Sequence, residues 1–219
     1  MINVKYELVI FDLDGTLLDT LKDLTRAVNH ALDVQGFPRR SREEVRHLIG
    51  NGIASTMRRA VPGNAGDEAF RQALSDFKAY YLSHVNEYTC PFDGIPAMLD
   101  AIADAGIMAA LNSNKVDSAT QALCEAHLKG KLACILGEQP QIPKKPAPDG
   151  ALQIMRQLGA SPARTLYVGD GETDIQTAFN AGIDCAWVSW GYRRREELGN
   201  LIVPHTFTTV PALLAFILR

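Results

Sequence analysis

Two aspartates spaced two residues apart, Asp12 and Asp14, carry the clearest chemical signal in this 219-residue chain. They follow the apolar run 8–11, which predicts a short buried strand, and Gly15 comes directly after them. Carboxylates at this spacing project into one crevice, and a glycine in the turn lets the backbone approach a ligand closely. Ligands of open α/β sheets bind beyond the carboxyl ends of the strands. One carboxylate could therefore attack a phosphoryl group while the other moves protons, although a polar turn is the simpler alternative.

Two further polar segments could bind an anion. The segment 112–115 follows a predicted strand at 107–111, and the Ser113 hydroxyl with a backbone N–H at a helix start suits a phosphate oxygen. The alternative is that Ser113 or Asn114 only caps the next helix. Two lysines precede the prolines of the segment 144–149, which could hold a lysine in one direction, although an exposed basic loop is equally compatible with the sequence.

The last polar segment combines two carboxylates with a strand end. Asp170 follows the predicted strand 165–168, and Asp174 lies four residues later, one turn into a predicted helix. Hard oxygen ligands in an anionic pocket suit Mg²⁺. The alternative is that Asp170 caps the helix while Asp174 faces solvent. Glu172 could also assist a metal, but a surface position is favoured.

Short apolar segments that alternate with helical patterns predict an α/β fold with a doubly wound parallel sheet. Strands are expected at 8–11, 107–111, 132–136, 165–168 and 183–188, and helices at 96–106, 116–128, 149–158 and 172–181. Residues 17–89 are expected to be entirely helical and to interrupt this pattern after the first strand. The predicted organisation is an α/β core made of residues 1–16 and 90–219, with an inserted α-helical cap at 17–89.

The helical segment contains several candidate features of its own. Ser41 and Glu44 fit a capping box, and Asp67 is expected to cap a helix that runs to about Asn86. Between helices, Asn51 and Gly52 could present backbone N–H groups to a substrate, or could only form a turn. Arginines of this segment suit a substrate carboxylate, although a solvated basic face is favoured for most of them: Arg39, Arg40, Arg42, Arg46, Arg58 and Arg59.

Composition narrows the class of protein. The net charge of -3 gives no reason to expect nucleic-acid or membrane binding, and no apolar run approaches the ~20 residues of a membrane span. The four cysteines match no metal spacing and are expected to be reduced, and the N-terminal residues do not resemble a signal peptide, so a cytoplasmic protein is expected. Trp187 and Trp190 are expected to pack against the core, and the run Tyr192–Arg195 is expected at the surface.

Together, the four polar motifs resemble the haloacid dehalogenase superfamily of aspartate-nucleophile hydrolases over the whole chain. The segments 12–20, 50–52, 91–115 and 145–149 are most similar to phosphoglycolate phosphatases and their close relatives, and the helical insertion resembles the family's cap. The resemblance implies a nucleophile at Asp12, an acid/base at Asp14, phosphate-binding residues at Ser113 and Lys145, and metal ligands at Asp12, Asp14 (through its carbonyl), Asp170 and Asp174. Gly171 departs from the pattern, because many relatives have serine there.

The function implied is Mg²⁺-dependent hydrolysis of a small phosphomonoester through an aspartyl-phosphate. Asp14 would protonate the leaving alkoxide and then activate water. The expected substrate is a small phosphorylated metabolite, bound by Ser113, Asn114, Lys145, Asn51 and Gly52, in a monomer or homodimer. Two alternatives remain: a phosphosugar mutase of the same superfamily, similar to β-phosphoglucomutase, and a non-catalytic regulatory or binding protein that retains the fold.

Overall fold

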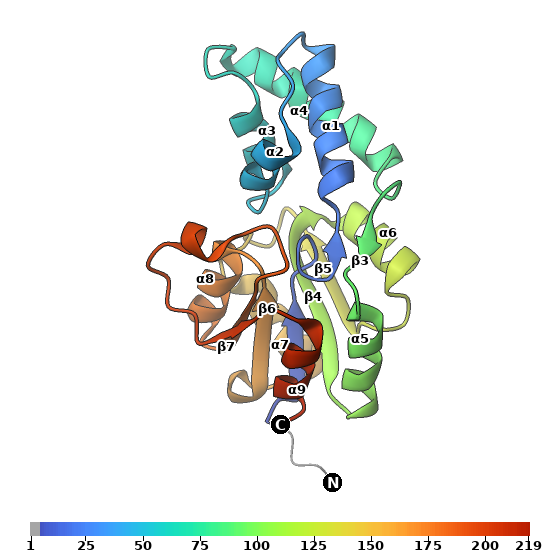
Figure 1. The fold of residues 1–219 in the computed structure, drawn as a ribbon, viewed down its shortest axis with the longest axis vertical. Helices are drawn as coiled ribbons and strands as arrows, with labels where there is room; N and C mark the ends of the chain where they lie inside the picture. Colours follow the sequence, from blue (N-terminus) through green and yellow to red (C-terminus); the bar gives the residue numbers. More distant parts are fainter. Residues whose placement is uncertain (1–4) are drawn as a thin grey trace.

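The computed structural model describes residues 5–219, so residues 1–4, where the core is predicted to begin, lie outside the described residues. A sheet flanked by helices forms the lower part of the molecule in Figure 1, and helices α1–α4 form a separate bundle over one end of that sheet. Among the described residues, no helix is both long and apolar enough to cross a membrane.

The sheet of the described chain is parallel throughout, with the strand order β5-β4-β1-β6-β7-β8. The strands are β1 (Leu8–Phe11), β4 (Met108–Val116), β5 (Cys134–Glu138), β6 (Thr165–Gly169), β7 (Asp184–Val188) and β8 (His205–Phe207). All four residues of the central β1 are buried, which explains why this segment is apolar throughout rather than alternating. The doubly wound α/β sheet predicted from the sequence is therefore confirmed.

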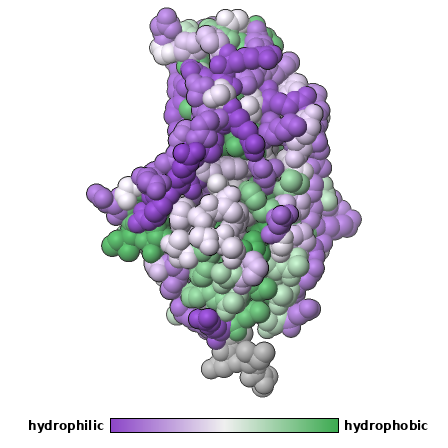
Figure 2. Space-filling model, viewed as in Figure 1, coloured by the Kyte–Doolittle hydropathy of each residue, from purple (hydrophilic) through white to green (hydrophobic). Residues whose placement is uncertain are grey.

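Helices cover both faces of the sheet. Val9 and Phe11 of β1 share an apolar cluster with α5 (Ile95–Asp104), α6 (Asp117–His127) and α9 (Val210–Ile217). Leu8 and Ile10 point to the opposite face, where α7 (Asp149–Leu158) and α8 (Glu172–Ala181) pack. Short 3₁₀ helices lie at Pro162–Arg164 and Arg195–Leu198. In the space-filling view, apolar surface gathers over the core whereas the bundle above it is mostly hydrophilic (Figure 2).

The bundle consists of α1 (Leu21–Val34), α2 (Arg42–Leu48), α3 (Ile53–Ala60) and α4 (Gly66–Ser83) around its own apolar cluster. The predicted capping box is confirmed, because the Ser41 side chain accepts from the Glu44 N–H and the Glu44 carboxylate accepts from the Ser41 N–H. The prediction for Asp67 is wrong. α4 begins one residue earlier and ends at Ser83, and Asp67 lies in its first turn, where its carboxylate pairs with Arg58 at 2.8 Å.

The expectation that residues 17–89 are entirely helical is also wrong. Residues Leu18–Asp19 form a short strand, β2, which pairs antiparallel with β3 (Cys90–Pro91) where the chain returns from the bundle. Each linker provides hydrogen-bond partners for backbone groups of the other. Because the two segments are far apart in the sequence, neither one shows a periodic pattern that would reveal the pairing. The two connections to the bundle therefore lie side by side.

A buried carboxylate on α1 fastens the returning linker. Asp23 is only 3% exposed, and its two oxygens accept from the backbone N–H groups of Tyr88 and Thr89 and from the Thr89 hydroxyl at 2.8–3.2 Å. These donors lie after the end of α4, in the segment that leads to β3. Asp23 therefore fixes the point at which the chain re-enters the core.

We expect Asp23→Ala to lower the free energy of unfolding by about 2–4 kcal/mol, because it leaves buried donors without an acceptor. The matched control is Asp33→Ala on the same helix, whose exposed carboxylate pairs with Arg39 in solvent and should contribute much less to stability. Urea denaturation followed by circular dichroism measures both. Equal losses from the two variants would show that the Asp23 contacts do not stabilise the linker.

Candidate active site

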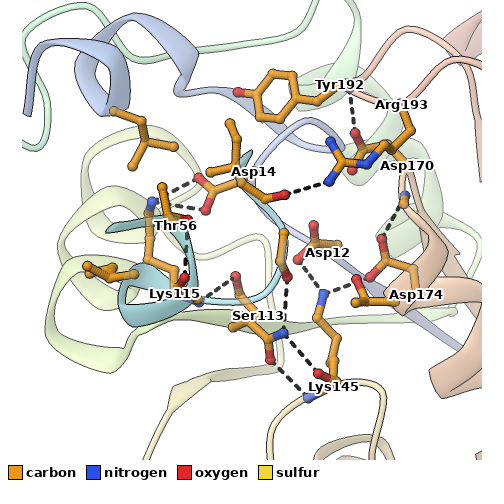
Figure 3. A pocket seen from close by; sticks show the side chains of 18 of the residues that line it. Asp12, Asp14, Thr56, Ser113, Lys115, Lys145, Asp170, Asp174, Tyr192 and Arg193 are labelled. Atoms are coloured by element: carbon orange, nitrogen blue, oxygen red, sulfur yellow. Dashed lines mark hydrogen bonds and ion pairs between the residues drawn. The ribbon is translucent and has the colours of Figure 1, made fainter. Parts of the chain in front are cut away.

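The predicted chemical residues converge at the carboxyl ends of three neighbouring strands. Asp12 follows β1, Ser113 lies near the end of β4, and Asp170 follows β6, and these strands are adjacent in the sheet (Figure 3). Lys145 approaches from the loop between β5 and α7, and Asp174 from the first turn of α8. All five residues line one cavity beneath the helical bundle.

The Lys145 ammonium lies between two carboxylates. Its Nζ is 2.7 Å from Asp12 Oδ1 and 2.7 Å from Asp174 Oδ1, and its side chain is 3% exposed. Burial alone would lower the pKa of Lys145, but Asp12 and Asp174 outweigh it and hold that pKa well above its usual value. Burial raises the pKa of Asp12 to about 7 although Lys145 opposes this. The lysine is therefore a fixed positive charge beside a desolvated carboxylate.

The carboxylates of Asp12, Asp170 and Asp174 fit a divalent cation. One oxygen of each lies within 4.8 Å of the others, and all three residues are buried. Burial and the neighbouring carboxylates raise the pKa of Asp170 well above its usual value. With all three ionised, one ammonium leaves a formal charge of about two negative units in a low-dielectric site. A hard cation with oxygen ligands would relieve this repulsion.

Two glycines allow the Asp170 carboxylate to lie close to the loop that follows Asp12. A Cβ at Gly15, whose φ is +88°, would lie 2.5 Å from Asp170 Oδ2, and one at Gly191 would lie 2.3 Å from the Gly15 carbonyl oxygen. Side chains at either position would displace this carboxylate. The Trp187 indole donates to the Asp170 carbonyl at 2.7 Å, so this tryptophan packs against the site and also fixes its backbone.

Asp14 is held away from the three clustered carboxylates by donors of its own. Lys115 Nζ lies 2.9 Å from its Oδ1 and 3.0 Å from its Oδ2, and the Thr20 hydroxyl donates to Oδ1 at 2.6 Å. The Lys115 side chain is 2% exposed and lies over the Tyr81 ring. Sequence reasoning missed Lys115, although it directly follows Ser113 and Asn114 and lines the same cavity.

Ser113 and Asn114 differ from the expected helix start. The strand β4 continues to Val116, and α6 begins at Asp117 without a side-chain cap, so neither residue caps that helix. Extension of the strand carries both side chains into the site. The Asn114 amide accepts from the Lys145 N–H at 2.9 Å and donates to the carbonyls of Lys145 and Gly50, so it joins the lysine loop to the bundle.

The expected surface position of Tyr192 and Arg193 is wrong. Both are buried, at 7% and 8% exposure, and both line the cavity. The Tyr192 N–H donates to Asp170 Oδ2, and its hydroxyl accepts from the Thr20 N–H at 2.7 Å. Arg193 pairs with Glu172 at 2.9 Å. Glu172, which could have assisted a metal, is therefore already engaged in an ion pair. Arg193 looks solvated in sequence because the carbonyls of Arg46 and Ile49, to which it donates, lie more than 140 residues away.

The wall contributed by the bundle is mainly apolar. It contains Leu24, Ile49, Ile53 and Phe77, and the Thr56 hydroxyl in it donates to the carbonyls of Leu48 and Gly52. Gly52 belongs to this lining, whereas Asn51 is exposed and does not.

The arginines of the bundle that could have bound a substrate carboxylate lie elsewhere. Arg58 pairs with Asp67 and packs on Phe70, and Arg59 donates to the carbonyls of His47 and Leu48. Neither side chain lines the cavity. Lys144, the alternative to Lys145, pairs instead with Glu138 at 2.7 Å.

Comparisons with known proteins agree with this geometry. A family model of haloacid dehalogenase-like hydrolases matches residues 9–188. The phosphoglycolate phosphatase of Pseudomonas putida is 36% identical over 84% of this chain and 70% of its own, and that of Aquifex aeolicus is 31% identical over 84% and 85%. A crystal structure of a protein from Lactobacillus delbrueckii subsp. bulgaricus, assigned as a phosphoglycolate phosphatase, superposes with a TM-score of 0.93 at 32% identity, covering 97% of this chain and 99% of its own.

We expect a divalent cation to raise the melting temperature of the protein by roughly 5–10 °C at about 100 times its Kd. Asp170→Asn should lose this rise, because one carboxylate ligand is gone, while the apo variant melts no lower than the apo wild type, since repulsion is relieved. Thermal unfolding with and without Mg²⁺, at constant ionic strength, measures both.

The matched control for this experiment is Asp100→Asn, whose exposed carboxylate pairs with Lys131 and should leave the cation-induced rise unchanged. An identical rise in wild type and Asp170→Asn would remove Asp170 from the metal site.

Proposed function

The chain belongs to the haloacid dehalogenase-like hydrolases, and we propose that this phosphatase hydrolyses a small phosphomonoester of the phosphoglycolate class through an aspartyl-phosphate on Asp12. The observation that carries the proposal is the position of Asp12. Its carboxylate lies at the end of the central strand, with the Lys145 ammonium 2.7 Å from one oxygen. An anionic nucleophile that must approach an anionic phosphate needs such compensating charge.

In the first step, an Asp12 carboxylate oxygen attacks phosphorus while the bond to the leaving alkoxide breaks. Lys145 and the Ser113 hydroxyl would bind the phosphoryl oxygens. At ~4 Å and an effective dielectric near 20, one such charge contact is worth on the order of 4 kcal/mol before desolvation. In the second step, water attacks phosphorus, and the Asp12 carboxylate is released with inorganic phosphate.

Asp14 would transfer the protons of both steps. Its carboxylate lines the same cavity as Asp12 but is separately held by Lys115 and Thr20. It would give a proton to the leaving alkoxide and later take one from the attacking water. A carboxylate that is positioned apart from the clustered carboxylates suits this role, because it need not serve as nucleophile.

We propose that the cation is Mg²⁺, held by Asp12, Asp170, Asp174 and the Asp14 carbonyl. All of these ligands are hard oxygens, as Mg²⁺ prefers. Bound there, it would neutralise the carboxylates and polarise the phosphoryl group. The protein's own part is to orient these carboxylates, which the Tyr192 N–H and Lys145 do.

The apolar bundle wall favours a small leaving group over a sugar. Leu24, Ile53 and Phe77 offer no partners to the several hydroxyls of a phosphosugar, which disfavours the mutase alternative. The single carboxylate of glycolate would have to face the polar lining at Asn114 and Arg193. The phosphoglycolate phosphatases among the relatives point to the same small class. We further propose that residues 17–89 act as a cap that selects the leaving group. The oligomeric state and the cytoplasmic location stay predictions.

Asp12→Asn should lower kcat by roughly 10⁴-fold or more, because the nearly isosteric amide is a far weaker nucleophile. Phosphate release from phosphoglycolate, ethyl phosphate and glucose 6-phosphate, with Mg²⁺, measures wild type and variant. Wild type should prefer the small esters and form no isomerised sugar phosphate. Turnover of the variant within tenfold of wild type would contradict the assignment of the nucleophile.

Asp14→Asn should separate the two half-reactions according to the leaving group. Nitrophenolate leaves without a proton, so rapid mixing with nitrophenyl phosphate should give a burst of about one equivalent. Slow turnover should follow, because water activation loses general-base help worth roughly 10²–10⁴-fold. An alkyl ester should give no burst. Equal slowing of both esters without a burst would instead assign Asp14 to positioning of the metal or of Asp12.

A further inference from the structure

The carboxyl end of α2 is bonded by two arginines from different parts of the molecule. The last carbonyls of a helix have no partner inside it. Arg59 of the bundle donates to the carbonyls of His47 and Leu48. Arg193, from the core loop after β7, donates to the carbonyl of Arg46 at 2.8 Å and to that of Ile49 at 2.6 Å. The core therefore completes the end of a helix that belongs to the bundle.

Arg193 is itself fixed on the core. Its Nε donates to Glu172 Oε2 at 2.9 Å, and its side chain is 9% exposed. The contact is reciprocal, because the Arg46 guanidinium donates to the Tyr192 carbonyl and pairs with Glu197 at 2.7 Å. A planar guanidinium can bond the two carbonyls and the carboxylate at once, which a lysine ammonium on a flexible stem does less well.

The loop that these contacts hold forms the roof of the active site. Ile49, Gly50 and Gly52 line the cavity that contains Asp12. A Cβ at Gly50 would lie 3.3 Å from Arg193 Nη2, so the loop backbone lies directly against the guanidinium. The Gly50 carbonyl also accepts from the Asn114 amide at 3.1 Å. The position of the loop is therefore set from the core side.

We propose that Arg193 is a positioning residue that docks the loop 49–52 of the bundle onto the core and thereby encloses the leaving group over Asp12. The inference deepens the proposed function and rests on it, because enclosure matters only if the chemistry takes place beneath the loop. Buried hydrogen bonds from a charged donor are strong, and the negative end of the α2 dipole adds to them. Loss of the guanidinium should release the loop and admit water to the site.

The variants that test this are Arg193→Met, which keeps the length of the stem, and Arg193→Lys, which keeps the charge. The exposed Arg195→Met, two residues further on, is the matched control. Thermal unfolding establishes that each variant is folded. Glu172→Gln, which removes the carboxylate charge paired with Arg193 but keeps an acceptor for its Nε, gives a second reading if Arg193→Met does not fold.

Two readouts are needed: kcat and KM for ethyl phosphate and nitrophenyl phosphate, and hydrogen–deuterium exchange of the amides at 49–53. In Arg193→Met we expect kcat/KM for ethyl phosphate to fall ~10- to 100-fold, with a rise in KM, and nitrophenyl phosphate to lose much less. Exchange at 49–53 should quicken at least ~10-fold while β1 stays protected. Arg193→Lys should recover part of both losses, Glu172→Gln should show smaller changes in the same direction, and Arg195→Met should match wild type.

Wild-type kinetics and exchange in Arg193→Met would overturn the inference. Lost activity with unchanged exchange at 49–53 would also overturn it, because Arg193 would then act on the reaction by another route. A wild-type enzyme inactive toward every phosphomonoester would contradict the proposed function instead, and the exchange data would still report whether Arg193 docks the loop.

Discussion

One buried ammonium, that of Lys145, allows the carboxylates of this site to coexist out of water. It lies 2.7 Å from both Asp12 and Asp174, while Asp170 shares the same space without an ammonium of its own. Burial raises the pKa of Asp12 and of Asp170. The chain's own positive charges therefore compensate only part of the negative charge of this cluster. A divalent cation would compensate the remaining negative charge, and together with Lys145 it would then offset the charge of an incoming dianionic phosphate.

The rest of the fold positions these charged groups and keeps them away from solvent. Parallel strands bring Asp12, Ser113 and Asp170 to one edge of the sheet, and hydrogen-bonded loops bring Lys145 to them. The bundle supplies an apolar roof, and paired linkers with the buried Asp23 fix where it joins the core. The contacts that position the site thus lie at the strand ends and at the two crossings between bundle and core.

The sequence predicts what depends on local pattern and strand order. The alternation of strands with helices gives the parallel sheet, and motifs at strand ends bring Asp12, Ser113, Lys145, Asp170 and Asp174 into one cavity. It does not predict β2 and β3, because their pairing is a contact between distant linkers. Tyr192 and Arg193 look like surface residues for the same reason, since their partners are Thr20 and the carbonyls of Arg46 and Ile49. Local periodicity contains no information about such partners.

In the proposed mechanism, a carboxylate of the chain, and not water, makes the first bond to phosphorus. The stereochemical course at phosphorus tests it directly, with a phosphorothioate monoester made chiral by sulfur and two oxygen isotopes and hydrolysed in water of the third isotope, so that the released thiophosphate is chiral. Two successive in-line displacements, first by Asp12 and then by water, each invert the phosphorus centre. A carboxylate nucleophile therefore gives net retention of configuration. Net inversion would mean that water attacks the ester in one step and would contradict the aspartyl-phosphate.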